Sequence, residues 1–421
     1  MVVQPRPLAP GPRAVTATLN PLHLLIGLTT FTHIASTGTR FTVTLAALKM
    51  GASPFLVGIL AAAFALLPTL IAVPAGKLAD RIGERWPMMV SAVIAIMAIL
   101  LPFLWHGLPA LFITCLLLGG ASNVIYMSTQ PLVGRYGKAE DRPANFGLFA
   151  MGYSTSSFAG PVIAGFAIDY LGFDVTFLLL AALPLALLTV LALDRLPLAR
   201  RQAAVKREAA PAGQSDRKRS TLELLREPRL FRLYAIGVLF STAWDMYIVL
   251  APIHGANVGL SASRIGIVIG VFSVATFAIR GLIPLLSRKF TPWRLLILSI
   301  IVIGLGDLGF GLAASFPLLI VFSFMLGLGQ GMSAPMINTL LYEAAPADRV
   351  AEAVGLRISA SNAIQTGLPL FAGAIGATVG IAPVFWATAA FMLWGAYATR
   401  AQWWDEKRRN AGRHDARPPG R

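Results

Sequence analysis

The chain has 421 residues, of which 56% are hydrophobic and 13% are charged, and its mean hydropathy is +0.70. Soluble globular proteins carry about 25% charged residues, so this composition excludes a soluble protein that covers itself with polar surface and predicts a chain embedded in lipid. The formal net charge of +16 suggests nucleic acid as a partner at first sight, but the positions of the basic residues argue against it.

One cysteine, Cys115, lies in an apolar run, so no intrachain disulfide framework is possible. The five histidines are scattered and form no HExxH or similar pair, so neither a metal site nor a cofactor is predicted. No phosphate-binding loop of the G-x-x-x-x-G-K-S/T type occurs, and no cluster of catalytic groups is evident. We therefore do not expect an enzyme or an ATP-driven pump.

Residues 1–18 are rich in proline and polar residues and are predicted to form a disordered cytoplasmic tail. They are not a cleavable signal, because the apolar stretch that follows is too long. A helix that crosses about 30 Å of hydrocarbon needs about 20 apolar residues. Twelve such spans are predicted at 21–47, 55–75, 87–105, 109–133, 146–169, 174–192, 231–252, 262–286, 294–313, 317–341, 354–378 and 382–400.

Glycine and proline positions repeat 208 residues apart, without any insertion. Because these residues constrain the backbone, their shared spacing predicts a shared backbone shape in the two halves. The repeated pairs include Gly51/Gly259, Gly58/Gly266, Gly119/Gly327, Pro161/Pro369, Gly165/Gly373 and Gly172/Gly380. The repeat maps spans 1–6 onto spans 7–12, and such a duplication is typical of a two-half transporter.

The basic residues alternate from loop to loop, and 30 of the 35 Lys and Arg fall in the tails and in alternate loops. The positive-inside rule then places both termini in the cytoplasm, and an even number of spans follows. The predicted organisation is a six-helix bundle at 19–192, a basic cytoplasmic linker at 193–230, a second six-helix bundle at 231–400 and a cytoplasmic tail at 401–421. The linker is expected to contain at most a surface helix.

The loop after the second span contains Gly76, Asp80, Arg81, Gly83 and Arg85. Their spacing resembles the G-x-x-x-D-R-x-G-x-R signature of the major facilitator superfamily, and the corresponding stretch of the second half is degenerate. The resemblance implies an all-α membrane fold of two pseudo-symmetric six-helix bundles that works as a monomer. It also implies that Asp80 meets basic groups and a helix N-terminus across a cytoplasmic gate, where a carboxylate is favoured.

Span 5 carries Gly147, Gly160, Pro161 and Gly165 in a spacing that is similar to the "antiporter" motif of the drug–proton exporters in that superfamily. Ser156 and Ala164 stand where the motif has glycine. Small residues and proline within a span also permit tight helix packing and bending in any membrane protein. An exporter-specific role and ordinary packing are both open interpretations.

Ionisable groups inside membrane spans are costly and usually functional. Asp245 of span 7 corresponds to Thr37 of span 1 in the repeat, three residues before Arg40, so the two charges are expected at similar depth. We interpret Arg40 and Asp245 as a substrate- or proton-sensitive pair; a static ion pair is the alternative. Asp307 could relay protons or pair with Arg280, which could also extend towards the cytoplasm.

The resemblance implies that spans 1, 4, 7 and 10 line a central cavity. Polar and aromatic residues in those spans suit a mixed polar and apolar organic solute, although each could also form an ordinary interhelical hydrogen bond. The candidates are His33, which can titrate near neutral pH, with Asn123, Tyr126, Gln130, Trp244, Tyr247, Gln330 and Asn338.

The sequence thus predicts a proton-coupled secondary transporter of a small organic molecule in a bacterial inner membrane. Export is favoured by the span 5 motif, and uptake of an organic anion is the alternative favoured by Arg40. A receptor or scaffold without transport activity is a third possibility. The substrate, the direction and the coupling stoichiometry are not determined by the sequence.

Overall fold

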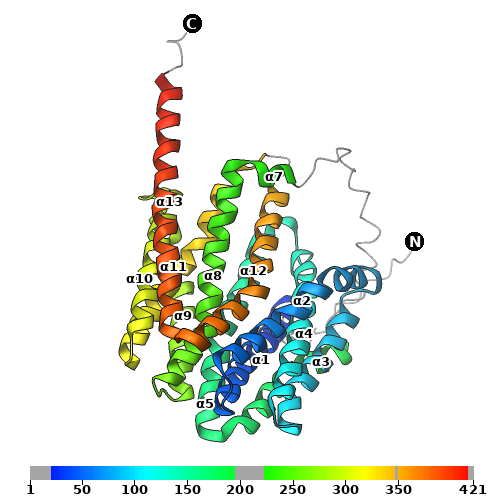
Figure 1. The fold of residues 1–421 in the computed structure, drawn as a ribbon. Coiled ribbons are helices and arrows are strands. Elements are labelled where there is room, and N and C mark those ends of the chain that lie inside the picture. The colour runs from blue at the N-terminus through cyan, green and yellow to red at the C-terminus, as the bar shows by residue number, and fades with distance from the viewer. Residues whose placement is uncertain (1–19, 195–221, 347–348, 416–421) are drawn as a thin grey trace, which may run out of the picture.

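The computed structural model describes residues 20–194, 222–346 and 349–415, and within these ranges the chain is helical and contains no strand (Figure 1). The predicted tail at 1–18 and most of the predicted linker lie outside the described residues. The first half contains α1 (Pro21–Lys49), α2 (Pro54–Ile82), α3 (Arg85–Leu104), α4 (Leu108–Gly134), the 3-10 helix η1 (Ala139–Asp141) and α5 (Arg142–Ala192). The short helix α7 (Leu222–Arg226) precedes α8 (Pro228–Asn257), α9 (Ala262–Leu286), α10 (Pro292–Leu312), α11 (Phe316–Ala344), α12 (Val350–Val379) and α13 (Ile381–Asp415).

Local capping explains where several of these helices begin. The Asn20 side chain accepts the Leu22 N–H at 3.1 Å in front of α1, and Pro21 occupies the first helical position. Ser261 and Thr291 cap α9 and α10 in the same way. Most predicted spans coincide with the helices to within four residues at each end. Three helices continue further: α2 to Ile82 instead of 75, α8 to Asn257 instead of 252, and α13 to Asp415 instead of 400.

The duplication predicted from the glycine spacing is present in the backbone. Gly51 and Gly259 have φ values of 79° and 77°, and Gly172 and Gly380 have φ values of 82° and 89°. Residues other than glycine rarely adopt this left-handed region. Gly172 is non-helical and divides α5 into two limbs, which correspond to the two spans predicted at 146–169 and 174–192. Each half therefore contains six helical segments within the described ranges.

Nine helices in the described part of the chain are long and apolar enough to cross a membrane. One of them, Ala144–Ala192, contains both limbs of α5. Helix α1 is not among the nine, and α12 contributes only the shorter apolar stretch Gly367–Val379. Both carry more polar side chains than their neighbours, among them Arg40 in α1 and Arg357 in α12. The chain is a multi-pass membrane protein of two pseudo-symmetric helical bundles, and the count of twelve crossings is consistent with the structure.

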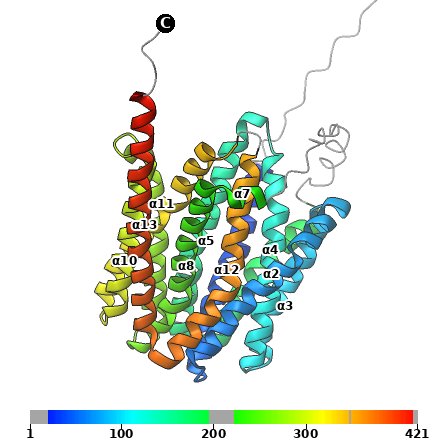
Figure 2. The same ribbon diagram turned by 45° about the horizontal axis from the view of Figure 1, so that its top comes forward.

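The two halves lie side by side, with α2 against α12 and α5 against α9 (Figures 1 and 2). At both contacts the backbones touch. A Cβ atom at Gly58 of α2 would overlap the carbonyl oxygen of Pro369 in α12, and one at Gly266 of α9 would overlap the carbonyl oxygen of Pro161 in α5. Gly58 and Gly266 are equivalent in the repeat, as are Pro161 and Pro369. The interface between the halves is therefore itself pseudo-symmetric.

The two ends of the bundle differ in charge. The "basic face" is the end formed by the α2–α3, α4–α5, α9–α10 and α11–α12 connections, which carry Arg81, Arg85, Arg135, Lys138, Arg142, Arg288, Lys289, Arg294 and Arg349. At the opposite end, the "neutral face", Lys49 and Arg264 are the only lysine and arginine near the helix ends of the described chain. Helix α7 lies at the basic face, where Arg349 pairs with Glu223 at 3.1 Å.

We predict that Gly327→Ala destabilises the second bundle by about 1–3 kcal/mol, because the added Cβ would collide with the Phe272 backbone of α9, which cannot move aside easily. The thermal unfolding temperature of the purified protein in detergent measures the effect. Gly281→Ala is the matched control, because no atom lies within 4 Å of its added Cβ. Equal unfolding temperatures for the two variants would contradict the prediction.

Candidate functional site

A cavity of about 280 Å³ lies between the two halves. Five helices contribute to it, namely α1, α4 and α5 from the first half and α8 and α9 from the second. Its lining consists of His33, Tyr126, Phe149, Ala150, Tyr153, Ser154, Ser157, Trp244, Ser273, Thr276 and Arg280. A cavity shared by both bundles is the expected place for a solute that must be exposed to each side in turn.

The cavity lies on the basic side of the contact between the halves. Along α5, which starts at the basic face, the lining positions 149–157 precede the contact positions 160–165. Along α9, which ends at the basic face, the contact positions 262–270 precede the lining positions 273–280. The halves therefore touch on the neutral side of the cavity, and the cavity lies between this contact and the basic face.

Aromatic rings form the wall contributed by the first half. The Tyr153 ring is at the centre of this group, with ring centroids 4.2 Å from His33, 4.9 Å from Tyr126 and 4.7 Å from Phe149. Trp244 of α8 faces the cavity from the second half and packs on Phe272. Such rings offer apolar surface to an organic solute, together with a few polar edges. The Nδ1 atom of His33 is buried and has no hydrogen-bond partner.

Arg280 of α9 is the charged residue of the lining. The predicted pairing of Arg280 with Asp307 is wrong, whereas its extension towards the cytoplasm stays a prediction. Asp307 is fully buried in α10, and neither of its carboxylate oxygens has a hydrogen-bond partner. Among the described residues, no carboxylate lies within ion-pair distance of Arg280. Its guanidinium group is therefore available to a solute.

Arg40 and Asp245 lie on α1 and α8, two helices that contact each other, and their action as a substrate- or proton-sensitive pair stays a prediction. They do not form a direct ion pair within the described structure. Arg40 instead lies over the Phe64 ring, with its Cζ atom 5.4 Å from the ring centroid. Asp245 is 6% exposed, and its Oδ2 atom has no hydrogen-bond partner. Neither Arg40 nor Asp245 is part of the cavity lining, although Asp245 directly follows the lining residue Trp244 in α8.

Five other predicted cavity residues do not line this cavity. Tyr247 is buried within the second bundle, where its hydroxyl bonds to Ser323 and its ring stacks on Phe272. The Gln330 amide donates to the Phe240 carbonyl at 3.5 Å. The remaining three are Asn338, whose Oδ1 atom is buried without a partner, and the half-buried Asn123 and Gln130 of α4.

The predicted gating motif lies at the basic face, between α2 and α3. Arg85 donates to the Leu191 carbonyl at 2.8 Å and pairs with Asp194 at 2.9 Å, so it ties the start of α3 to the end of α5 within one half. Gly83 has a φ of 89°, and Arg81 is exposed. Gly76 and Asp80 belong to α2, and the Asp80 side chain lies outside the described part of the structure.

The span 5 motif lies where α5 meets α1 and α9. A Cβ at Gly160 would overlap the Thr37 hydroxyl and the Gly38 backbone of α1. Pro161 and Gly165 face α9 at the contact between the halves, whereas no atom would contact a Cβ at Gly147. Most of this motif therefore permits close approach between helices.

The sequence analysis missed the cavity residues of α5 and most of those of α9. The signal was present as helical spacing. Phe149, Tyr153 and Ser157 recur every four residues, and Ser273, Thr276 and Arg280 follow at intervals of three and four. These intervals place each set on a single helix face. The family resemblance implies a cavity lined by spans 1, 4, 7 and 10, and spans 5 and 8 are not among these.

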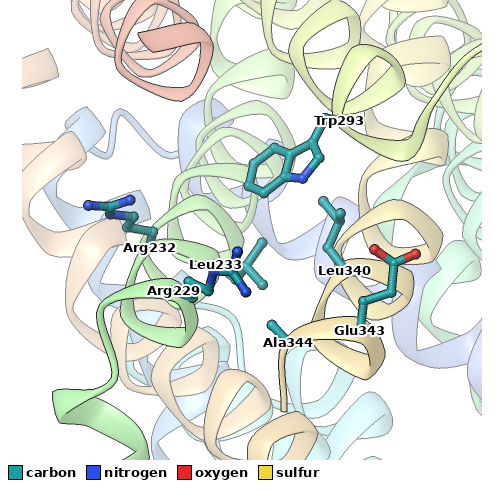
Figure 3. A pocket seen from close by; sticks show the side chains of 7 residues that line it. All are labelled: Arg229, Arg232, Leu233, Trp293, Leu340, Glu343 and Ala344. Carbon is teal, nitrogen blue, oxygen red and sulfur yellow. The ribbon is translucent and has the colours of Figure 1, made fainter. Parts of the chain in front are cut away.

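A second, smaller cavity of about 60 Å³ lies within the second half, near the basic face (Figure 3). Its polar lining comprises Arg229 and Arg232 of α8, Trp293 of α10 and Glu343 of α11. Figure 3 shows the guanidinium group of Arg232 directed away from Glu343. This cavity holds only a few water molecules and touches one bundle alone, so it does not compete with the central cavity as a solute site.

Comparison with known families gives one match that covers most of the chain. The family model described as "Major Facilitator Superfamily" matches residues 25–306 and 233–418. A probable sulfoacetate transporter, SauU, from Cupriavidus necator is 32% identical over 87 residues. That alignment covers 21% of this chain and 20% of the relative, so it relates only a fifth of either protein to the other.

Solved transporter structures share the fold. A POT family transporter in complex with a thioalcohol-conjugated peptide matches with a TM-score of 0.73 at 15% identity, covering 90% of this chain and 95% of the other. The nucleoside transporter NupG matches with a TM-score of 0.72 at 14% identity, over 90% and 99% of the two chains. A bacterial homologue of the human lysosomal transporter Spinster, in an inward-facing and occupied conformation, has a TM-score of 0.71 at 16% identity, over 90% and 95%.

We predict that Ser157→Cys reacts with a membrane-impermeant thiol reagent added from the basic side of the membrane, because Ser157 lines the cavity. Ala164→Cys should react far more slowly, because Ala164 is fully buried beside the contact between the halves. The native Cys115 is buried and gives a low background. Equal labelling rates at 157 and 164 would contradict this placement of the cavity.

Proposed function

Because the chain belongs to the Major Facilitator Superfamily and is thus a membrane transporter of small molecules, we propose that its solute is a small organic anion. We further propose that alternating access of the central cavity moves this anion and that protons drive the movement. The observation that carries the proposal is Arg280, a cation in the cavity lining that has no ion-pair partner among the described residues.

The chemistry of the lining supports an anion that also has some apolar surface. A guanidinium group binds carboxylate or sulfonate oxygens through paired N–H donors. The rings of Tyr126, Phe149, Tyr153 and Trp244 then offer contacts to the carbon skeleton. A volume of about 280 Å³ suits a small molecule better than a long chain. Ser154, Ser157 and Ser273 add hydroxyl groups for further polar atoms.

The named substrate of the partial relative agrees with this class. Sulfoacetate is a two-carbon anion with one carboxylate and one sulfonate, and the relative is described as a probable transporter of it. The shared segment covers a fifth of the chain, so the comparison supports an anionic solute in general.

Proton coupling is proposed to reside in Asp245 and Arg40. A buried carboxylate with an unpartnered oxygen is costly when charged, and protonation removes that cost. Protonation of Asp245 would also leave the positive charge of Arg40 uncompensated, which favours entry of an anion nearby. Proton binding and anion binding would then support one another, which is the requirement for coupled movement.

We propose uptake as the direction, because protons that move with the anion would offset the electrical cost of its entry. The interior of a bacterial cell is electrically negative, so an anion enters against the membrane potential unless cations accompany it. Co-transport of protons supplies those charges. We propose a bacterial inner membrane, with both termini and the basic face in the cytoplasm, so that the present structure is the state open to the cytoplasm. A single chain contains the whole cavity, and we propose a working monomer.

Efflux in exchange for protons is the second candidate, and the span 5 motif favours it. Gly160 and Pro161 lie at the two helix contacts that close α5 against α1 and α9. Tight closure at this position would limit proton leakage through an exchanger. Both candidates use the same cavity and differ in the sign of the coupling between solute and protons.

Flux in proteoliposomes under an imposed pH gradient separates the two candidates. Uptake of a labelled organic anion such as sulfoacetate into vesicles with an alkaline interior supports co-transport. Accumulation in vesicles with an acidic interior supports exchange. The anion proposal is wrong if the protein transports a cationic dye but transports no anion from a panel of carboxylates and sulfonates.

We predict that Arg280→Gln raises the KM for the anion about 10- to 100-fold, because it removes a charged hydrogen-bond donor from the cavity. Arg280→Lys should recover part of the affinity, since it restores the charge but not the planar donor geometry. Initial uptake rates measure both. Arg288→Gln is the matched control, because it removes an exposed arginine two turns further along the chain. An unchanged KM in Arg280→Gln would refute this role.

We predict that Asp245→Asn abolishes accumulation driven by a pH gradient but retains exchange of labelled for unlabelled anion at equal pH. The amide cannot exchange a proton, whereas the cavity itself remains intact. Counterflow assays and gradient-driven uptake assays on the same vesicles distinguish these activities. Gradient-driven accumulation at the wild-type rate would show that Asp245 does not couple protons.

A further inference from the structure

Asp169, near the end of the first limb of α5, binds the backbone of the opposite half. Its carboxylate oxygens accept the N–H groups of Ala262 at 3.1 Å and of Ser263 at 2.8 Å. These are the first two residues of α9. The hydroxyl groups of Ser261 and Ser263 lie against the same carboxylate. A carboxylate from one bundle thus caps a helix N-terminus of the other.

Without Asp169, the start of α9 would lack partners. The first four N–H groups of a helix have no acceptor within the helix itself. In α9, the Ser261 side chain accepts the Arg264 N–H. Asp169 supplies the acceptors for the N–H groups of Ala262 and Ser263. The negative charge also interacts favourably with the positive end of the helix dipole.

This contact lies on the neutral side of the cavity, at the exposed edge of the interface between α5 and α9. A Cβ at Gly165, one turn before Asp169, would lie 2.5 Å from the Ala262 carbonyl oxygen. When the cavity opens to the neutral face, α5 and α9 must separate here. The carboxylate and the N–H groups would then bind water in place of one another.

The equivalent contact of the other pair of helices has no such carboxylate. Repeat symmetry places Ala377 of α12 where α5 has Asp169, and Pro54 and Phe55 of α2 where α9 has Ala262 and Ser263. Pro54 has no N–H group to donate. The α2–α12 contact therefore relies on backbone packing of Gly58 and Gly373, and the α5–α9 contact alone carries the polar capping interaction.

We propose that Asp169 is a positioning residue of the transport cycle, which stabilises the closed neutral face by capping α9 across the two halves. This inference rests on the proposed alternating access, and it adds the residue that biases the equilibrium between the two states. Asp80, by its family resemblance, is expected to act at the basic face. Asp169 provides a carboxylate contact of the same chemistry at the opposite face.

Distances between spin labels test the proposal. Labels at Met50→Cys in the first half and Ser315→Cys in the second lie on exposed connections of the neutral face, in a Cys115→Ala background. We expect Asp169→Ala to increase the ratio of long to short distances about five- to tenfold, which corresponds to the loss of a helix cap. Asp169→Asn should have a smaller effect, because an amide oxygen still caps a helix but carries no charge.

Asp174→Ala is the matched control. Asp174 is an exposed carboxylate on the second limb of α5, but it pairs with His106 of the same half at 3.2 Å. Its removal should leave the distance distribution unchanged. A distribution in folded Asp169→Ala that matches the wild type overturns the proposal. If Asp169→Ala fails to fold, Asp169→Asn and a folded Asp169→Ser replace it. A wild-type distance distribution in both of these variants also overturns the proposal.

The measurement is made without solute, so it does not depend on the identity of the transported molecule. If no anion is transported, the anion proposal is wrong but the distances still test Asp169. If the distance distribution is unchanged, the Asp169 proposal is wrong but the anion proposal is unaffected. A folding defect alone would lower the unfolding temperature without shifting the balance between the two distances. Recovery of the short distance by Asp169→Glu would support the role of the carboxylate.

Discussion

Two backbone-to-backbone contacts determine how the halves of this protein meet. Gly58 lies on the Pro369 carbonyl and Gly266 on the Pro161 carbonyl, at positions related by the internal repeat. Any side chain at either glycine would force the helices apart. Because the bundles touch so closely at these points, the interface towards the neutral face is closed, and the space between the halves begins only beyond them. The position of the cavity follows from these contacts.

The chemistry of the cavity depends on a positive charge in its lining that no carboxylate of the lining balances. Arg280 is placed in the lining between aromatic rings, and the acids within the membrane lie elsewhere. Asp245 is buried in α8 with an unpartnered Oδ2 atom, and Asp307 is enclosed in the second bundle without a hydrogen-bond partner. A cation in a confined space of low dielectric attracts an anion more strongly than one in water. The same reasoning explains why a proton on Asp245 would change the affinity for that anion.

Much of the architecture could be predicted from the chain alone. The helix positions agree with hydrophobic run lengths, and the duplicated glycines reappear as matching left-handed residues such as Gly172 and Gly380. These predictions succeeded because they depend on local properties, namely the length of an apolar run and the backbone freedom of a residue. The cavity was predicted less well. His33, Tyr126 and Trp244 line it, but Tyr247 lies in the bundle core, and the faces of α5 and α9 were overlooked.

The sequence by itself determined that the chain is embedded in a lipid bilayer and that it is built from two related halves. It also determined which residues within the membrane spans are charged. Only the tertiary structure decided that Arg280 faces the cavity while Asp307 does not, and that Asp169 reaches across to α9. The reason is physical. Helical periodicity determines which residues share a face, but the packing of the other helices decides whether that face meets lipid, the core or the cavity.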